Sequence, residues 1–370
     1  MSTSELTSEQ VALKEALPSS VSLSTEDCLA SAKELKGKVV VVTGAGAGFG
    51  RSYSLLAASH GAKVVASDIK LETVEGLVQE IKKAGGEAIA THCNTADWDS
   101  QVAMFRLAIN TYGFIDSVVV NAGVTEAPGW LDDKEGPDGE PVKPPSMTTD
   151  VNLIGASYTT RLAFYHLQKN PSTGLKSLVL LGSMSSFFGI PLAPMYSMSK
   201  HAMMGLFRSL YYSAQPIGIN VNIVCPWFVA TGILDTGALL AVAGLPLATV
   251  DNVVSGIFKA SSDPNYNGYI LAIDASGVLS ISHDAFFLGD GGYYRAFLSR
   301  AAFTISTIKT IKDVVAAIRV ARRPSPQKTA IKAVGIAALA WGVYGAGGIG
   351  EFTIPGLVAR GAAAAALLVI

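Results

Sequence analysis

The sequence contains few cysteines, few charged residues and no excess of either charge sign. Its three cysteines, Cys28, Cys93 and Cys225, lie far apart, without a Cys-x-x-Cys pair or a Cys/His cluster. They support neither a disulfide framework nor a zinc site, and a reducing compartment is expected. The five histidines are also scattered, so no metal site is predicted. A formal net charge of −1 gives no reason to expect a nucleic-acid partner.

The amino-terminal residues lack the basic segment and apolar run of a secretory signal, so a cytoplasmic protein is expected. Charged residues make up only 15% of the chain and hydrophobic residues 49%, with the apolar excess concentrated near the carboxyl terminus. There, residues 333–350 are uncharged and follow a basic stretch, and this run is about the minimum length of a membrane span. Three interpretations stay open: a membrane anchor with the folded domain on the cytoplasmic side, a helical hairpin packed on that domain, or an oligomer contact.

Short apolar strands alternate with helical segments through the middle of the chain. Residues 38–43 form a β-branched run of the kind that is buried on both faces of a parallel sheet. This alternation predicts βαβ units in a doubly wound parallel α/β sheet of the Rossmann type, with right-handed crossovers. The expected strands cover residues 38–43, 63–68, 87–91, 115–120, 175–181, 219–224 and 269–273. The expected helices cover residues 49–60, 71–84, 97–112, 147–169 and 194–215.

Changes in composition divide the chain into four predicted parts. They are a loose polar arm with one short helix (1–36), the α/β sheet domain (37–277), a helical, partly basic extension (278–332) and the apolar tail (333–370). Inside the sheet domain, residues 126–146 are rich in proline and glycine and are expected to form a loop. Residues 231–265 leave the regular alternation and are expected to form a helical flap.

A glycine-rich turn follows the first of these strands and opens a helix. Gly44, Gly48 and Gly50 let the backbone turn tightly and approach a pyrophosphate, which would face the free N–H groups of the helix. The spacing is G-x-x-x-G-x-G rather than G-x-G-x-x-G, and a plain structural turn could use the same residues. Asp68, at the end of the second strand, could accept hydrogen bonds from ribose hydroxyls and would repel a 2′-phosphate, which favours NAD over NADP. A simple strand-end cap is the alternative for Asp68.

Tyr196 and Lys200 stand four residues apart, so a helix would place the phenol and the ammonium on one face. A neighbouring cation favours the phenolate and would lower the tyrosine pKa, giving an acid/base group tuned to working pH. Ser183 follows the strand at 175–181, where its hydroxyl could share a substrate oxygen with Tyr196. Asn152 lies within an apolar helix, where it is either a surface residue or a buried amide that needs a partner.

These pieces occur in the order found in the short-chain dehydrogenase/reductase family, which the chain resembles over about residues 36–277. The matching motifs are Thr43-Gly44-x-x-x-Gly48-x-Gly50, Asp68, Asn121-Ala122-Gly123, Asn152, Ser183, Tyr196-x-x-x-Lys200, Val221-Asn222-x-Val224-x-Pro226 and Thr231. Within the family, the chain looks most like enzymes of the 15-hydroxyprostaglandin dehydrogenase type. Departures from the family pattern include Asn94 in place of an aspartate and Trp227 in place of a glycine.

The resemblance implies a function for each matching residue. Tyr196 would donate or accept the proton, Lys200 would lower its pKa and hold the nicotinamide ribose, and Ser183 would orient the substrate oxygen. Asn152 would support a proton relay. The implied cofactor contacts are Gly44, Gly48, Phe49, Gly50, Asp68, Asn94, Asn121, Ala122, Gly123, Tyr196, Lys200, Val229 and Thr231.

We therefore expect an oxidoreductase that uses NAD, with NADP not excluded, to interconvert an alcohol and a ketone on a hydrophobic small molecule. A homo-oligomer is expected as well. Two alternatives stay open: an epimerase or dehydratase that retains its cofactor, and a non-catalytic nucleotide-binding membrane scaffold. The apolar residues around Trp227 and Phe228 favour a lipid-like or polycyclic substrate, although core packing would explain them too.

Overall fold

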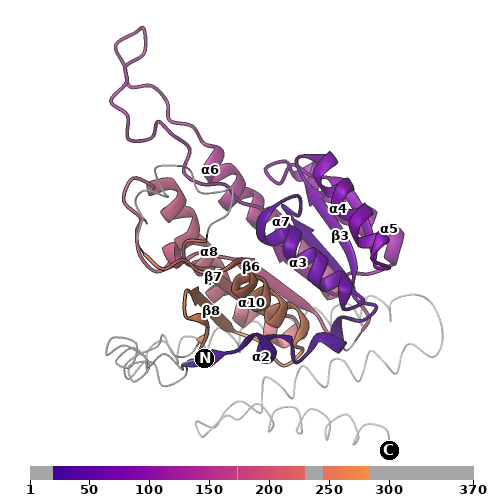
Figure 1. Ribbon diagram of the computed structural model, residues 1–370. Helices are drawn as coiled ribbons and strands as arrows, with labels where there is room; N and C mark the ends of the chain where they lie inside the picture. Colours follow the sequence, from indigo (N-terminus) through magenta and orange to yellow (C-terminus); the bar gives the residue numbers. More distant parts are fainter. Residues whose placement is uncertain (1–19, 173, 230–244, 284–370) are drawn as a thin grey trace, which may run out of the picture. The chain divides into compact units, whose positions relative to one another are not determined.

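The structure is a computed structural model that describes residues 20–172, 174–229 and 245–283; the rest of the chain is drawn as a grey trace in Figure 1. Several predictions therefore lie outside the described residues. They concern the first part of the helical flap (residues 231–244 of 231–265), the basic extension beyond residue 283, the apolar tail and Thr231. Among the described residues, no helix is long and apolar enough to cross a membrane.

A nine-stranded sheet forms the centre of the fold, in the order β1-β9-β8-β7-β6-β5-β2-β3-β4. Seven strands run parallel, and the order reverses between β2 and β5, which is the switch point where ligands bind in sheets of this kind. The parallel strands are β2 (Val39–Thr43), β3 (Lys63–Asp68), β4 (Glu87–His92), β5 (Ser117–Val120), β6 (Ser177–Leu181), β7 (Asn220–Pro226) and β8 (Tyr269–Asp274). Each matches a predicted strand, with ends that differ by up to two residues.

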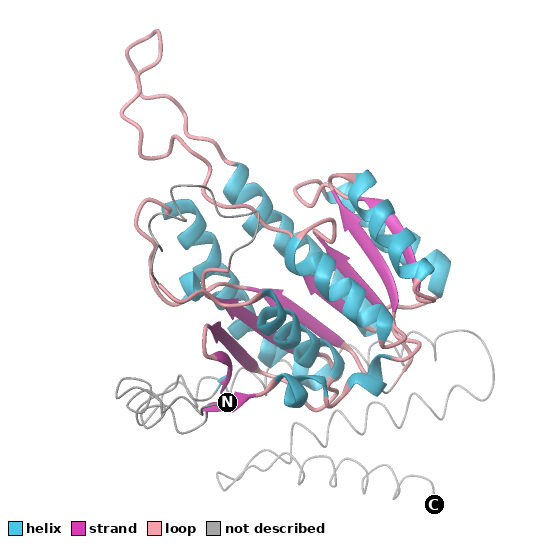
Figure 2. Ribbon diagram, viewed as in Figure 1, coloured by secondary structure: helices cyan, strands magenta, loops and turns pink. Residues whose placement is uncertain are grey.

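Helices cover both faces of the sheet (Figure 2), which explains the unbroken apolar strands. In β2, Val40 and Val42 pack into one core while Val39 and Val41 pack into the other. The first core takes residues from α3 (Gly48–Ser59), α4 (Leu71–Lys83) and α10 (Val250–Ser262). The second takes residues from α5 (Trp98–Tyr112), α7 (Ala156–Lys169) and α8 (Pro194–Ala214).

The sheet extends beyond the predicted domain at both ends. The arm, expected to be loose, contributes β1 (Ser20–Leu23), followed by the short helix α2 (Thr25–Leu29) and the 3-10 turn η1 (Ala32–Leu35). The sheet pattern was expected to end near Gly277, but β9 (Gly277–Ser282) pairs antiparallel with both β8 and β1. Four-residue β1 becomes a strand only through this long-range pairing, so its own sequence carries no strong signal.

The proline-rich segment between β5 and the short helix α6 (Met147–Thr149) forms the expected loop, which runs out from the sheet and returns (Figure 1). Its base is held by Thr148, whose hydroxyl accepts from the Ala127 N–H at 2.8 Å and donates to the Thr125 carbonyl at 3.0 Å. The loop therefore begins and ends beside the carboxyl edge of the central strands.

Candidate active site

The glycine turn joins β2 to α3 and leaves no room for a side chain at Gly44 or Gly50. Gly44 has a positive φ of 65°, and a Cβ there would lie 2.8 Å from the Ala122 Cα. A Cβ on Gly50 would lie 2.3 Å from the Gly44 carbonyl oxygen. Ala47 at the N-cap of α3 makes no side-chain cap, so the first amides of the helix keep their capacity to bind an anion. The cradle fits the pyrophosphate of a dinucleotide.

The predicted Asn121-Ala122-Gly123 turn supports this cradle from β5. The Asn121 side-chain amide donates to the carbonyls of Thr43 and Gly44, at 2.9 and 3.0 Å. The Thr43 hydroxyl in turn accepts from the backbone N–H groups of Asn121 and Ala122. These bonds fix the turn at the switch point. Thr43 lay within the quoted motif, but its hydroxyl was not among the predicted contacts.

Asp68 lies at the end of β3 and faces the glycine turn, as predicted. One carboxylate oxygen accepts from the Gly46 N–H at 3.0 Å, and the other accepts from the Lys70 N–H at 3.0 Å. Asp68 is thus a strand-end cap, and its half-buried carboxylate also presents negative charge beside the turn. Nearby Arg51 is ion-paired with Glu80.

The other predicted cofactor contacts differ in their surroundings. Asn94 follows β4, and its side-chain oxygen accepts from the Ala96 N–H at 3.1 Å, which leaves the amide N–H₂ as the group available to a base. Phe49 is partly buried in the first turn of α3, against the core. Val229, which follows β7, is buried and forms an isolated parallel β-bridge with Ala248. Thr231 lies outside the described residues.

Tyr196 and Lys200 lie on the first two turns of α8 as predicted, with the Lys200 Nζ 5.6 Å from the centre of the Tyr196 ring. The Lys200 side chain is buried, and its Nζ donates to the Leu181 carbonyl at the end of β6, at 2.9 Å. The same spacing occurs at Tyr165 and Lys169 on α7, where the two side chains are in direct contact but Tyr165 is exposed. The two pairs differ in burial and in neighbours.

Burial dominates the titration of the Tyr196–Lys200 pair. It raises the pKa of Tyr196 above its ordinary value, and a hydrogen bond with the Ser183 side chain offsets this only in part. Burial also lowers the pKa of Lys200 to about 8. The pairing alone was expected to lower the tyrosine pKa. The shift runs in the opposite direction, because desolvation of the phenol outweighs its hydrogen bond with Ser183. The Lys200 ammonium itself donates to the Leu181 carbonyl.

Of three neighbouring serines, Ser183 is the one whose side chain bonds Tyr196. Its hydroxyl caps the 3-10 turn η3 (Met184–Ser186). Ser185 instead bonds the Ser197 hydroxyl, and Ser186 accepts from the Ser183 backbone N–H. Behind this turn lies the buried thiol of Cys225, which the sequence analysis did not connect with the site. Burial raises its pKa to about 12, so it is a poor nucleophile.

Asn152 is buried rather than on the surface, which decides between its two interpretations. It lies in a π-helical turn, η2 (Asp150–Gly155), that precedes α7. Its side chain pairs with both backbone groups of Val124, each at 2.8 Å, and its amide donates to the Ser199 hydroxyl at 3.3 Å. Asn152 therefore joins the residues after β5 to helix α8. Its contact on α8, Ser199, directly precedes Lys200.

Aromatic side chains border the carboxyl edge beside Tyr196. Phe188 follows η3 and is 41% exposed, and its ring centre lies 5.9 Å from that of Trp227, which follows β7. Trp227 also packs edge-on against Phe228. Four apolar residues in the first part of the predicted flap lie outside the described residues. They are Ile233, Leu234, Leu239 and Leu240.

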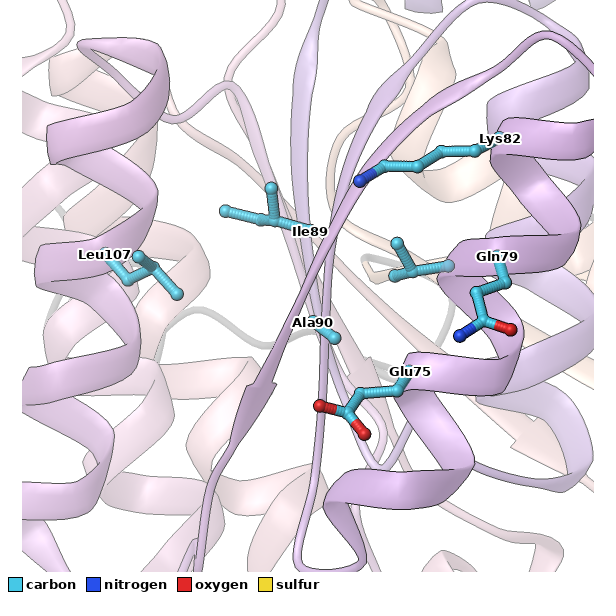
Figure 3. Close-up of a pocket in the computed structure, with 7 residues that line it drawn as sticks. Glu75, Gln79, Lys82, Ile89, Ala90 and Leu107 are labelled. Atoms are coloured by element: carbon cyan, nitrogen blue, oxygen red, sulfur yellow. The ribbon is translucent and has the colours of Figure 1, made fainter.

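A separate hollow of about 530 Å³ lies at the far edge of the sheet (Figure 3). Side chains of α4, including Gln79 and Lys82, face Ile89 on the edge strand β4, and Leu107 of α5 lies across from them. None of these elements carries the tyrosine, the lysine or the glycine turn, so this hollow is distinct from the candidate active site.

Comparison with known proteins agrees with this geometry. The family model described as short chain dehydrogenase matches residues 38–237. The chain is 30% identical over 270 residues to 5'-hydroxyaverantin dehydrogenase of Dothistroma septosporum, covering 68% of this chain and 88% of that protein. It is also 30% identical over 253 residues to the NADP-dependent dehydrogenase clz5 of Cochliobolus lunatus, covering 63% and 87%.

Among solved structures, a short-chain type dehydrogenase/reductase from Mycobacterium marinum has a TM-score of 0.59 and 23% sequence identity. That match covers 67% of this chain and 98% of the other, and it supports the fold. The chain belongs to the short-chain dehydrogenase/reductase family. It is an oxidoreductase that acts on alcohols or ketones with a nicotinamide cofactor.

Proposed function

We propose that the chain interconverts a secondary alcohol and a ketone on a hydrophobic small molecule, with NAD as its cofactor. The observation that carries this proposal is a half-buried Tyr196 that bonds Ser183 and lies one helical turn before a buried Lys200. This arrangement lies at the carboxyl edge of the sheet, where the glycine turn also lies. A phenol and a hydroxyl side by side can together hold one substrate oxygen.

When bound, the nicotinamide cofactor supplies or takes up the hydride, and the protein handles the proton. In the direction of reduction, the Tyr196 hydroxyl donates its proton to the ketone oxygen while the Ser183 hydroxyl holds that oxygen in place. In oxidation, the Tyr196 oxygen accepts the alcohol proton. Lys200 is the nearest cation to the phenol, and its charge favours the phenolate formed after donation. Asn152 holds the segment after β5 against α8.

Negative charge at the end of β3 supports NAD over NADP. The Asp68 carboxylate lies beside the turn that would hold the adenosine ribose, where it would bind ribose hydroxyls and repel a 2′-phosphate. Arg51, which follows the turn in α3, is already paired with Glu80, while Lys70 follows Asp68 by two residues. The Cochliobolus lunatus relative is named NADP-dependent, so the preference needs a direct test.

The variant Asp68→Asn tests this preference directly. It keeps one oxygen to accept from the Gly46 N–H, removes the charge and gives up the bond from the Lys70 N–H. We expect the ratio of NADPH to NADH dissociation constants to fall by roughly tenfold, since a repelled phosphate then meets a neutral amide. Fluorescence titration with both reduced cofactors measures the ratio. Glu72→Gln, in the first turn of α4, is the control because it removes the same charge at another position. An unchanged ratio in Asp68→Asn would contradict the role given to Asp68.

The aromatic border supports a hydrophobic substrate. Phe188 and Trp227 lie on the segments that follow β6 and β7, the same strand ends that carry Ser183 and lead to Val229. Phe188 is exposed and Trp227 partly buried, and aromatic side chains beside a few polar groups that fix orientation are typical of small-molecule sites. A cyclic or lipid-like secondary alcohol would suit this border.

The decisive experiment is a turnover assay with a panel of cyclic and acyclic secondary alcohols and NAD, after titration with NADH and NADPH. Net formation of NADH with at least one alcohol is expected. Conversion of substrate without net NADH would instead favour a cofactor-retaining epimerase or dehydratase. Tight cofactor binding without conversion of any alcohol or ketone would favour a nucleotide-binding scaffold.

A further inference from the structure

Helix α8 lacks a cap of its own at the end that carries the tyrosine. Its N-cap residue is Ala193, whose methyl group cannot accept a hydrogen bond, and its first residue is Pro194. The backbone N–H of Tyr196 is therefore one of the helix donors that must find a partner elsewhere. That partner is Glu126, whose Oε2 accepts from the Tyr196 N–H at 2.7 Å. Seventy residues separate the two in sequence.

Glu126 belongs to a four-residue segment, 124–127, that makes hydrogen bonds to three different elements around the site. Val124 pairs with the side chain of Asn152 through both backbone groups. Thr125 and Ala127 pair through their backbones with the Thr148 hydroxyl. Glu126 reaches α8. The segment thus ties the π-helical turn that carries Asn152 to the helix that carries Tyr196.

The cap is made at a cost that an ordinary cap would avoid. A serine or aspartate at position 193 could accept the same N–H from the solvent edge of the helix. Here the acceptor is Glu126, a residue outside the helix. Its second carboxylate oxygen, Oε1, is buried without a hydrogen-bond partner among the described residues. The negative charge faces the positive end of the α8 dipole, which compensates in part. Such a buried, half-satisfied group indicates a constraint other than stability.

We propose that Glu126 is a positioning residue for Tyr196. By holding the backbone N–H of the tyrosine itself, it prevents the first turn of α8 from fraying and keeps the phenol in register with Ser183. This inference rests on the proposed function, because it assigns a role in placing the group that transfers the proton. It also predicts a local effect in the free protein that does not depend on substrate.

Three variants separate positioning from simple helix capping. Glu126→Ala removes the acceptor, Glu126→Gln keeps an acceptor oxygen at the same reach, and Glu126→Asp keeps the charge but withdraws the oxygen by one methylene. With NAD and the alcohol that gives the highest turnover in the panel, we expect kcat to fall roughly 10- to 100-fold in the Ala and Asp variants. In Glu126→Gln it should stay within about threefold of wild type, and KM and the NADH dissociation constant should change little in all three.

Hydrogen exchange of the free protein supplies the second measurement. The Tyr196 amide should exchange at least about tenfold faster in Glu126→Ala than in wild type, and at near wild-type rate in Glu126→Gln. Ser24→Ala, which removes the side-chain cap of α2 far from the site, is the control. It should lower the melting temperature slightly and change neither kcat nor the Tyr196 exchange rate.

Two outcomes would overturn the proposal. One is a kcat in Glu126→Ala within about twofold of wild type. The other is equal loss of kcat in the Gln and Ala variants, which would mean that the acceptor oxygen is irrelevant. Failure of the proposed function is a different result, in which turnover survives Tyr196→Phe. If Glu126→Ala does not fold, the Asp and Gln variants carry the same comparison.

Discussion

Tyr196→Phe should lower kcat by roughly 10²- to 10⁴-fold, the usual contribution of a positioned acid/base group. The change removes one oxygen from a half-buried ring, and with it the hydrogen bond to Ser183. It leaves the glycine turn and Asp68 untouched, so the NADH dissociation constant should stay within about threefold. Steady-state kinetics with NAD and a secondary alcohol, together with NADH titration, measure both quantities.

The chain contains its own control for this experiment. Tyr165 and Lys169 repeat the Tyr-x-x-x-Lys spacing on α7, but Tyr165 is exposed and its hydroxyl bonds Lys169. Tyr165→Phe should leave kcat unchanged. Near wild-type turnover in Tyr196→Phe, or an equal loss in the two variants, would contradict the assignment of Tyr196 as the proton donor and acceptor.

Lys200→Met should abolish most of the turnover while making the fold more stable at neutral pH. Burial lowers the pKa of Lys200 to about 8, so holding the charged side chain inside the protein costs free energy. Against an unfolded value near 10.4, this shift corresponds to a cost on the order of 3 kcal/mol below pH 8. Methionine avoids that cost. It also leaves the Leu181 carbonyl without its donor, which destabilises the folded state by about 1 kcal/mol or more.

The pH dependence of this difference has a definite sign. Between about pH 8 and the unfolded pKa, the unfolded wild-type chain binds more protons at Lys200 than the folded chain does, so wild-type stability gains with rising pH. The methionine variant has no such gain. Its advantage in unfolding free energy should therefore be largest at pH 7 and shrink towards pH 10.

Denaturant unfolding at both pH values measures this difference, and Lys36→Met, at an exposed position, is the control. A stability difference for Lys200→Met that is the same at pH 7 and pH 10 would contradict the lowered pKa. A variant that keeps near wild-type kcat would contradict the role of the ammonium beside Tyr196.

Local patterns were enough to predict most of the fold. The β-branched run in β2 and its counterparts are short-range signals, and a strand buried on both faces needs apolar residues at every position. The positions of Tyr196, Ser183 and Asp68 at strand ends and on a helix face followed from these elements. By contrast, β1 exists because it pairs with β9 across the length of the domain, and no local pattern encodes that contact. Strand β9 itself follows β8 in a tight hairpin.

The electrostatics of the site could not be predicted from spacing. Two tyrosine–lysine pairs with the same helical spacing occur, and the structure places one at the sheet edge and the other on the surface. The predicted lowering of the Tyr196 pKa considered only the charge four residues away. Desolvation by side chains from other elements proves larger, and it acts in the opposite direction.

The sequence by itself determined the order of strands and helices, the family and the residue types that can bind a dinucleotide and move a proton. It could do so because helix and strand periods act over a few residues. Only the tertiary structure decided which side chains meet: Glu126 with the amide of Tyr196, Asn152 with Val124, and Lys200 with the Leu181 carbonyl. Burial and partners depend on how distant segments pack, and that packing sets the energies of the site.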